Sequence, residues 1–495
     1  MMSYWEKDRK KKFKKIEKDE ETSVCVIGGG LTGLSVAYYL SKFMPMILLE
    51  KNQICDKTSS KNTGKVTSQH GLFYNYLINS QDQEFASKYL EANQNAIDEI
   101  EKMIKTEKID CDFEREDSFV FTQTDEKINE IENEYESVKT LNKDLCEIID
   151  NIDAPIKIKK ALKFKNQAKI HPVKYGYGLA NAIEKNNGKI FEEADVTNIT
   201  HKEDQYEIEV NNQKVYAKYV VLTTRYPIMN FPGYYFLKMY QSTSFAMVFD
   251  CKTDLFEGMY ISADIPTISF RTINENGKKL LFVVGYDYKT GTNEQKDGFN
   301  EIEKMVKKMY PNAEIVSKWT AEDCITLDKI PYIGKYSNIM SNLYIATGFN
   351  KWGITSSNIA GQIICDLIKN KDNKYEEIFK STRLEPIKNR TEMSNMIKEA
   401  NESILLSKFK IPMEQLKDIK IGEGKIVNID NNKIGVYRYN ENKLYKVKPI
   451  CTHLGCELSF NNIEKIWECP CHGSKFNYDG ISLETPSNKN LEIIE

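Results

Sequence analysis

The pattern of hydrophobic and polar positions changes twice along this chain, near residue 371 and near residue 412. In residues 23–371, helical periodicity such as that of 84–105 alternates with short apolar runs such as 206–210 and 219–223, which are typical of strands. This mixture predicts an α/β domain.

The two remaining regions differ in their patterns of hydrophobic and polar residues. Residues 372–411 are polar and lysine-rich with few apolar positions, which predicts a helical connector. From residue 412, short alternating segments are separated by glycine and asparagine turns, and this pattern predicts a small antiparallel β-domain over 412–495. Its expected strands are 425–429, 433–439 and 443–447.

The first 22 residues form a basic segment, with eight lysines and arginines between Lys7 and Lys18. Such a run can contact an anionic surface, but we expect a solvated helix or tail. Acidic residues follow it at once, so we expect no signal peptide. No apolar run reaches the roughly 20 residues of a membrane span, and we expect a cytoplasmic protein.

Composition narrows the class of protein and directs attention to the C-terminus. A hydrophobic content of 41%, a charged content of 28% and a net charge of -3 are ordinary for a globular protein and argue against a nucleic-acid partner. Four of the eleven cysteines lie within residues 451–472, together with two of the five histidines. This clustering is typical of metal ligands.

A nucleotide fingerprint stands near the start of the α/β region. A buried-strand run at 24–27 leads into Gly28, Gly30 and Gly33 (G-x-G-x-x-G), a helix follows, and Glu50 ends the next strand, 17 residues after Gly33. The glycines permit a tight turn, the helix N-terminus attracts a pyrophosphate, and the acid can bind a ribose. The order of elements predicts a dinucleotide site, for either FAD or NAD.

Later segments resemble the D-amino-acid oxidase-like (DAO) family of FAD-dependent oxidoreductases. The resemblance rests on residues 58–71 (TSSKNTGKVTSQHG), 170–172 (IHP), 193–199, 220–225 (VVLTTR), 319–334, 344–350 (YIATGFN) and 353–354. It implies a Rossmann-type FAD-binding domain with a mixed β-sheet substrate domain, the latter formed from about 71–165 and 230–318.

The fingerprint and the resemblance together assign FAD contacts to a set of residues. These are Gly28, Gly29, Gly30, Leu31, Thr32, Gly33, Glu50, Lys51, Thr63, Gly64, Thr67, His70, Val196, Thr223, Gly348, Phe349, Gly353, Ile354 and Thr355.

Candidate catalytic residues are fewer. His70 could shuttle protons or hold the flavin ring, or it could be a hydrogen-bonded structural histidine. We do not expect a covalent bond between it and the flavin. Arg271, Tyr286 and Tyr288 could bind a substrate carboxylate, although surface or core roles fit equally well.

The C-terminal cluster has two boxes, Cys451-Thr-His453-Leu-Gly-Cys456 and, twelve residues later, Cys469-Pro-Cys471-His472-Gly-Ser474. A Rieske-type [2Fe-2S] centre needs two thiolates on one iron and two imidazoles on the other, which two Cys/His boxes can supply. Zinc is the alternative, but its usual Cys2His2 spacing is C-x2-C with H-x3-H, unlike this order.

The boxes resemble those of Rieske proteins, with Cys451, His453, Cys469 and His472 as cluster ligands. The remaining pair, Cys456 and Cys471, resembles the disulfide of the cytochrome bc type. The resemblance also implies that the Ser474 hydroxyl bonds to a cluster sulfur and that Pro486 belongs to a shielding loop. Phe476 stands where high-potential members have a tyrosine, so a lower potential is expected.

Together these parts predict a dehydrogenase. No second G-x-G-x-x-G is present for NAD(P)H, so an amine or amino-acid-like substrate would reduce FAD, which would pass electrons singly to the cluster and on to an unknown external acceptor. The arrangement resembles bacterial proteins with a DAO-like domain fused to a Rieske domain.

The sequence excludes one other function and leaves two open. An oxygenase needs a two-histidine, one-carboxylate iron site, which His70, His171 and His201 are not spaced to form. An oxygen-using flavin oxidase with a regulatory Rieske module stays open, as does a non-enzymatic electron-transfer or redox-sensing protein.

Overall fold

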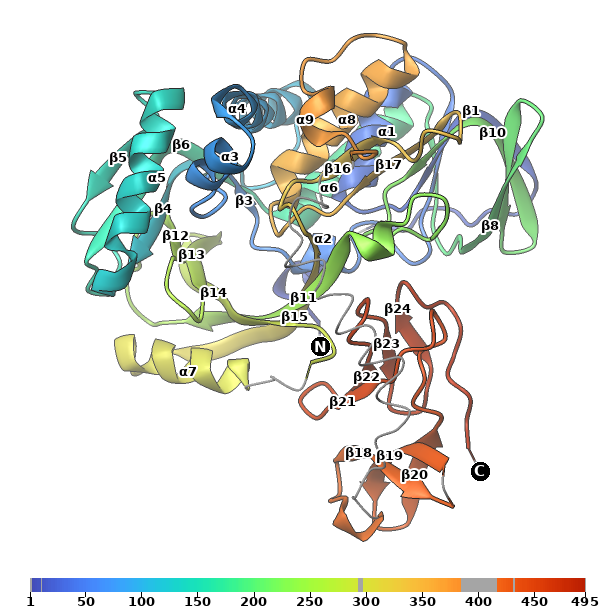
Figure 1. The fold of residues 1–495 in the computed structure, drawn as a ribbon. Coiled ribbons are helices and arrows are strands. Elements are labelled where there is room, and N and C mark those ends of the chain that lie inside the picture. Colours follow the sequence, from blue (N-terminus) through green and yellow to red (C-terminus); the bar gives the residue numbers. More distant parts are fainter. Residues whose placement is uncertain (1, 10, 293–296, 384–415, 431, 495) are drawn as a thin grey trace.

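Two large sheets and a small β-domain make up the chain (Figure 1). The computed structural model describes residues 2–9, 11–292, 297–383, 416–430 and 432–494. The expected connector at 372–411 is described only as far as Arg383, where it includes the short helix α9 (Glu376–Phe379). The rest of that segment lies outside the described residues.

The first sheet has a parallel centre: β1 pairs in parallel with β2 and with β10, β2 with β7, and β10 with β17. Its order is β16-β17-β10-β1-β2-β7, and the hairpin strands β8 and β9 extend from β10. The last four residues of β1 are fully buried, as expected for a strand covered on both faces. The strands are β1 (Glu20–Ile27), β2 (Met46–Leu49), β7 (Lys189–Phe191), β8 (Val196–Lys202), β9 (Gln205–Val210), β10 (Gln213–Leu222), β16 (Tyr332–Lys335) and β17 (Leu343–Thr347).

Three helices pack together beside this sheet. Helix α1 (Leu31–Ser41) follows β1 directly and lies against both α8 (Gly353–Ile368) and α6 (Pro172–Lys185) (Figure 1). All three bury most of their residues, so the start of α1 is held rigidly at the end of β1.

The second sheet has nine strands in the order β15-β11-β14-β13-β12-β4-β6-β3, with β5 paired to β6. Helices α3 (Tyr74–Ser80), α4 (Gln83–Glu107) and α5 (Ile128–Leu141) gather at one end, and α7 (Gly298–Met309) packs on β11 and β14 (Figure 1). The short helix α2 (Thr58–Lys61) touches β15. The strands are β3 (Lys65–Val66), β4 (Glu114–Thr122), β5 (Cys146–Ile149), β6 (Lys160–Lys169), β11 (Met239–Asp250), β12 (Met259–Ser262), β13 (Ile268–Glu275), β14 (Lys278–Lys289) and β15 (Glu314–Thr326).

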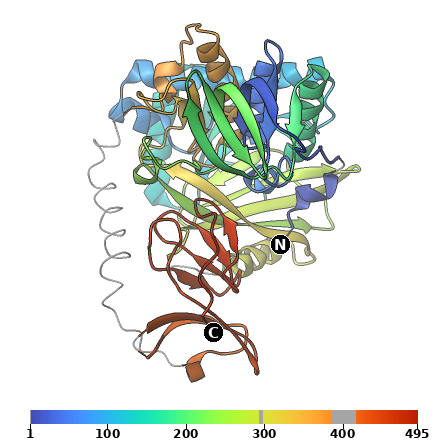
Figure 2. The ribbon, with the colours of Figure 1, turned by 90° about the vertical axis from the view of Figure 1, so that its right-hand side faces the viewer.

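The C-terminal domain is all β, in two antiparallel sheets. One contains β18 (Gly424–Ile429), β19 (Asn432–Asn440) and β20 (Lys443–Val447), the three strands expected from alternation. The other contains β21 (Ser459–Asn461), β22 (Ile466–Glu468), β23 (Lys475–Asn477) and β24 (Ser482–Glu484). The second sheet lies against the large region and the first points away from it (Figure 2). The expected fold class is confirmed.

The N-terminal segment differs from the expected solvated helix or tail. A short 3-10 helix (Tyr4–Asp8) buries Trp5 completely, and Phe13 and Ile16 are also buried. Arg9 pairs with Asp56 at 2.8 Å. The expectation was wrong because it weighed only the charges, whereas the few apolar side chains between them dock on the domain.

No helix in the described part of the chain is long and apolar enough to cross a membrane.

Candidate functional site

A cavity of about 640 Å³ opens at the carboxyl ends of β1, β2 and β10 and reaches across to the second sheet. Its size is within the usual range for small-molecule sites, and its position matches that of ligands in open α/β sheets. Residues 482–488 of the C-terminal domain, except Glu484, also form part of its wall. The cavity is therefore shared by two domains.

The glycine turn forms one end of this cavity. Gly28 has a φ of +109°, a backbone conformation that residues with a side chain rarely adopt. A Cβ on Gly33 would lie 1.8 Å from the Gly28 carbonyl oxygen, so only glycine fits there. Helix α1 begins two residues after Gly29, and its N-cap, Gly30, lacks a capping side chain. The Leu31 N–H donates to the Ser59 hydroxyl at 3.0 Å, and Leu31, Thr32 and Ser59 all line the cavity. The N-terminus of the helix therefore faces the cavity, as a pyrophosphate requires.

Glu50 closes β2 beside this turn. Its carboxylate accepts hydrogen bonds from the backbone N–H of Gly29 at 2.6 Å and of Asn52 at 2.8 Å. Burial raises the pKa of Glu50 to about 7, while these hydrogen bonds oppose the rise. The carboxyl group lines the cavity and is held where a ribose hydroxyl can reach it.

Most residues expected to contact FAD line this cavity. They are Gly28, Gly30, Leu31, Thr32, Glu50, Lys51, Thr63, Val196, Thr223, Gly348, Phe349, Gly353 and Ile354. The other six are not part of its lining: Gly29, Gly33, Gly64, Thr67, His70 and Thr355. Gly29 and Gly33 act on the turn itself, through the bond to Glu50 and the close backbone approach.

His70 lies behind the cavity wall. Its Nδ1 is 2.8 Å from the Tyr89 hydroxyl and its Nε2 is 3.0 Å from the Thr67 carbonyl oxygen, so both ring nitrogens are engaged. Burial lowers the pKa of His70 to about 3, and the ring is neutral. The ring stacks on Trp352, which lines the cavity. The geometry supports the alternative of a structural histidine.

The expected substrate residues do not line the cavity either. Arg271 is buried, and its guanidinium donates to the carbonyl oxygens of Thr63, Thr272 and Ile170. Burial lowers the pKa of Arg271 to about 10. Because its donors bond to backbone carbonyls, including that of the cavity residue Thr63, this arginine supports the cavity wall from behind, and the geometry favours a core role over carboxylate binding.

The two tyrosines are also placed elsewhere. The Tyr286 side chain packs in the hydrophobic cluster of the second sheet. The Tyr288 hydroxyl accepts a hydrogen bond from Asn461 at 3.0 Å and lies 3.4 Å from Glu468, both in the C-terminal domain. Tyr288 therefore belongs to the domain interface, and the core and interface roles replace the expected substrate role.

Charged and aromatic residues that sequence reasoning did not single out also line the cavity, among them Lys65, Arg225, Asp323, Lys351 and Trp352. These five lie in or beside segments quoted for the family resemblance, but their residue types there carried no local signal. Their shared position depends on how the two large sheets meet.

The cysteine and histidine boxes come together on two loops of the C-terminal domain, between β20 and β21 and between β22 and β23. The thiols of Cys451 and Cys469 are hydrogen-bonded to each other, which lowers the pKa of Cys451 to about 7 and raises that of Cys469. The His453 and His472 rings lie 5.1 Å apart.

The state of the two imidazoles fits a cluster. Burial lowers the pKa of His453 to about 4 and that of His472 to about 3, so both rings are neutral. Both Nδ1 atoms are buried and, among the described residues, have no hydrogen-bond partner. Two thiols and two unpaired ring nitrogens are the donors that a Rieske [2Fe-2S] centre needs.

The expected disulfide is present. Cys456 and Cys471 are bonded and tie the two ligand loops together across a sequence separation of 15. The neighbouring Ser474 is fully buried and its hydroxyl is hydrogen-bonded to the Cys451 thiol. Pro486, on the third loop, lines the cavity described above.

A segment of the large region covers the two histidines. The ring of Tyr226, three residues after the cavity residue Thr223, lies edge-on to His453 at 6.4 Å and to His472 at 6.2 Å. Asn230 Oδ1 is 3.0 Å from His453 Nε2, and Gln241 Nε2 donates to the His472 carbonyl at 2.6 Å. The ligand side of the C-terminal domain therefore faces inward.

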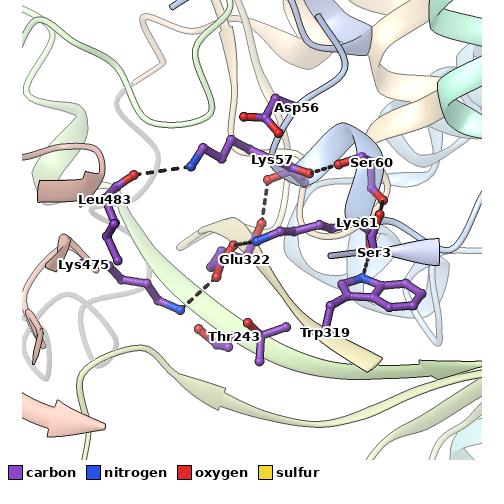
Figure 3. A network of polar contacts seen from close by, with 12 residues as sticks. Ser3, Asp56, Lys57, Ser60, Lys61, Thr243, Trp319, Glu322, Lys475 and Leu483 are labelled. Carbon is purple, nitrogen blue, oxygen red and sulfur yellow. Dashed lines mark hydrogen bonds and ion pairs between the residues drawn. The ribbon is translucent and has the colours of Figure 1, made fainter. Parts of the chain in front are cut away.

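A buried charge network centred on Lys475 fastens this interface (Figure 3). The Lys475 ammonium pairs with Glu322 of β15 at 2.8 Å and with Glu464 and Glu468 of its own domain at 2.9 and 3.3 Å. The Lys475 and Glu322 side chains are each only 3% exposed.

Two cations of the large region, Lys61 and Arg225, complete the network around Glu322. Lys61 is shown in Figure 3. Glu322 lies 3.6 Å from Lys61 and 3.4 Å from Arg225. Burial by itself raises the pKa of Glu322, but the three cations outweigh it and hold that pKa far below its ordinary value. Glu322 therefore stays ionised between cations from both domains.

Comparison with known families agrees with both sites. Residues 23–367 match the model of the FAD dependent oxidoreductase (DAO) family, and residues 410–495 match that of the Rieske [2Fe-2S] domain. The chain belongs to the DAO family of FAD-dependent oxidoreductases. It carries FAD in the first domain and a [2Fe-2S] cluster in the second.

The chain is similar to the "Putative Rieske 2Fe-2S iron-sulfur protein YhfW" of Bacillus subtilis, with 33% identity over 98% of this chain and 95% of that protein. The gamma-glutamylputrescine oxidoreductase of Escherichia coli is 24% identical over 71% of this chain and 85% of that protein.

Solved structures resemble the large region in fold. Glycine oxidase from Geobacillus kaustophilus is 16% identical with a TM-score of 0.61, covering 74% of this chain and 99% of the oxidase. L-proline dehydrogenase from P. horikoshii is 17% identical with the same TM-score, covering 74% and 98%. Both likenesses show the fold of this DAO domain.

The close approach inside the glycine turn predicts that the Gly33→Ala variant loses FAD. Its methyl group would overlap the Gly28 carbonyl, so the turn must open and the pyrophosphate site with it. We expect roughly a tenfold or greater loss of FAD affinity, equal to about 1.4 kcal/mol or more. Flavin fluorescence during FAD titration of the apoprotein measures it.

A Gly277→Ala variant is the control for Gly33→Ala. Gly277 also has a positive φ but has open space at the Cβ position, on an exposed turn away from the cavity. FAD affinity should stay at the wild-type value, and equal losses in both variants would contradict the role of the Gly33 contact.

The charge network predicts that Lys475→Met loosens the domain interface. Three carboxylates would lose their shared cation, and removing one partner of a buried ion pair typically costs about 3–5 kcal/mol. Hydrogen exchange should accelerate in β22, β23 and the facing part of β15. Lys448→Met, which removes an exposed pair with Glu492, is the control and should leave exchange unchanged.

Proposed function

We propose that this enzyme oxidises a CH–NH or CH–NH2 group of a small amine or amino-acid-like substrate in the shared cavity. The electrons then pass singly to the Rieske cluster and leave through it to an external acceptor. Bound FAD supplies the two-electron oxidation and the change to one-electron transfer.

One observation carries this proposal: a single segment joins the cavity to the cluster ligands. Thr223 lines the cavity, and Tyr226 contacts both histidines three residues later. Tyr226 is 1% exposed, and its hydroxyl has no partner among the described residues, so the ring packs beside the two histidines without a competing hydrogen bond. This continuity supports electron transfer within the chain.

Two further features support electron transfer from the flavin to the cluster. Residues 482–483 and 485–488 of the Rieske domain form cavity wall, and the Lys475 network holds that domain in place, so electrons need no domain movement to reach the cluster. Histidine ligation also raises the potential of a cluster above that of most ferredoxin types, which favours flow from flavin to cluster.

The relatives support a nitrogen-containing substrate. Their names include gamma-glutamylputrescine oxidoreductase, glycine oxidase and L-proline dehydrogenase, which all point to amines or amino acids. The absence of a second glycine fingerprint from the sequence supports an organic reductant over a nicotinamide nucleotide.

The proposal is tested by an anaerobic screen of amines and amino acids against the enzyme loaded with both cofactors. Flavin bleaching and the paramagnetic signal of the reduced cluster are followed together. We expect a substrate that produces both changes in sequence. Bleaching without a cluster signal would contradict the internal route, and failure of every compound to bleach the flavin would contradict the substrate class.

The position of Tyr226 predicts a difference between two variants. Tyr226→Leu removes the ring between the sites, so cluster reduction after flavin bleaching should slow roughly tenfold, about 1.4 kcal/mol of barrier. Tyr226→Phe keeps the ring and removes only an unpartnered hydroxyl, so the rate should stay near that of the wild type. Stopped-flow absorbance measures both rates; equal rates in the two variants would refute a role for the ring.

A further inference from the structure

The carboxylates that line the cavity differ in whether they are already engaged. Asp56 pairs with Arg9, Asp195 with Lys51 and Asp287 with Lys351, at 2.8, 3.1 and 2.9 Å. Glu50 accepts two backbone hydrogen bonds. Within the ranges that the structure describes, the Asp323 carboxylate has no hydrogen bond and no ion pair. It is the lining acid that still lacks a partner.

The β-strand places this carboxylate toward the cavity. Successive side chains of a strand point to opposite faces, and in β15 the preceding residue, Glu322, is committed to the Lys475 network. Asp323 therefore faces the other way, into the cavity, on the wall formed by the second sheet. The same wall presents the neutral hydroxyls of Ser244, Thr267 and Ser269.

The cationic side chains near Asp323 already contact other carboxylates. Lys351 pairs with Asp287, and Arg225 lies 3.4 Å from Glu322. Burial raises the pKa of Asp323 to about 6; Lys351 and Arg225 oppose the rise, and Glu322 and Asp287 add to it. A half-buried carboxylate with unused acceptor capacity is a site for a cation from outside the chain.

We propose that Asp323 binds the protonated amino group of the substrate and takes one proton from it. The N–H bond of the ammonium breaks, an O–H bond forms on the carboxylate, and the electron pair stays on nitrogen. The products are a neutral amine and a neutral carboxylic acid, and the neutral amine is the form that can be oxidised. This inference rests on the proposed function and makes Asp323 a catalytic residue.

The inference also narrows the substrate class to cationic amines without a carboxylate on the amino-bearing carbon. A substrate carboxylate at that position would lie beside Asp323 and be repelled by its charge. The nearest cations, Lys351 and Arg225, already contact Asp287 and Glu322. An amine of net positive charge is not repelled by Asp323 and does not need a cationic partner from the protein.

Ligand binding to the oxidised, fully loaded enzyme tests this without turnover. The oxidised flavin spectrum is titrated under anaerobic conditions with 1-aminobutane and with 2-aminopentanoate, which adds a carboxylate to the amino-bearing carbon. Calorimetry provides a second readout if the spectrum does not change. We expect wild-type enzyme to bind 1-aminobutane at least roughly tenfold more tightly, as one charge-assisted hydrogen bond allows.

The Asp323→Asn variant keeps the size of the side chain and removes its charge. Its affinity for 1-aminobutane should fall roughly ten- to hundredfold, and its preference over 2-aminopentanoate should disappear. Glu314→Gln is the matched control: it removes a carboxylate from the exposed start of the same strand, where Glu314 pairs with Lys252 away from the cavity. That variant should bind as the wild type does.

The pH dependence provides a further readout. An alkylamine stays protonated throughout pH 5–8, so a change in its affinity over this range reports on the protein. Asp323 is ionised above its pKa of about 6, where binding should be tight, and affinity should fall as pH drops below it. The Asn variant should lack that fall.

Failures of the two proposals are distinguishable. If 2-aminopentanoate binds as tightly as 1-aminobutane, or if Asp323→Asn binds the amine normally, the role of Asp323 is refuted even when amino acids bleach the flavin. If neither compound class binds or bleaches the flavin, the proposed function is itself refuted.

Discussion

The ion pair between Lys475 and Glu322 determines how the two redox domains of this chain are arranged. Burying an ammonium and a carboxylate costs several kcal/mol for each ion unless both keep close partners. Here Lys475 has three carboxylates around it, and Glu322 has cations from both domains. Each group also has partners in its own domain, but separating the domains would remove the 2.8 Å pair that joins them, so the network favours the docked arrangement.

That arrangement decides what surrounds each cofactor site. The Rieske domain adds a wall to the flavin cavity, and the segment at 226–241 covers the histidines with Tyr226, Asn230 and Gln241. Burial keeps both histidine rings neutral, with their Nδ1 atoms unpaired. The same contacts that dock the domain thus leave the ring nitrogens available to iron and place an aromatic ring beside them.

Strand alternation links docking to substrate chemistry. In β15, Glu322 points to the Rieske domain and Asp323 to the cavity, so adjacent residues serve the interface and the proposed amine site. Their charges also act on each other, since the ionised Glu322 adds to the rise in the Asp323 pKa. A change at the interface is therefore felt electrostatically in the cavity.

The sequence alone determined the features that depend on neighbours along the chain. The glycine turn, the buried strand before it and Glu50 follow from local backbone geometry, and the two Cys/His boxes follow from the ligand needs of one cluster. Alternation also located the three strands β18, β19 and β20. Family resemblance, in addition, predicted the disulfide and further cavity residues such as Thr63, Thr223 and Gly348.

Only the tertiary structure decided which polar side chains meet across the domains. Arg271, Tyr286 and Tyr288 had suitable chemistry, but the fold directs Arg271 to backbone carbonyls and the tyrosines to a core and an interface. Asp323 carried no local signal, because its role depends on two sheets and a distant domain closing around it. Lys475 pairs with Glu322 across 153 positions of sequence, a separation over which no local pattern reports contact.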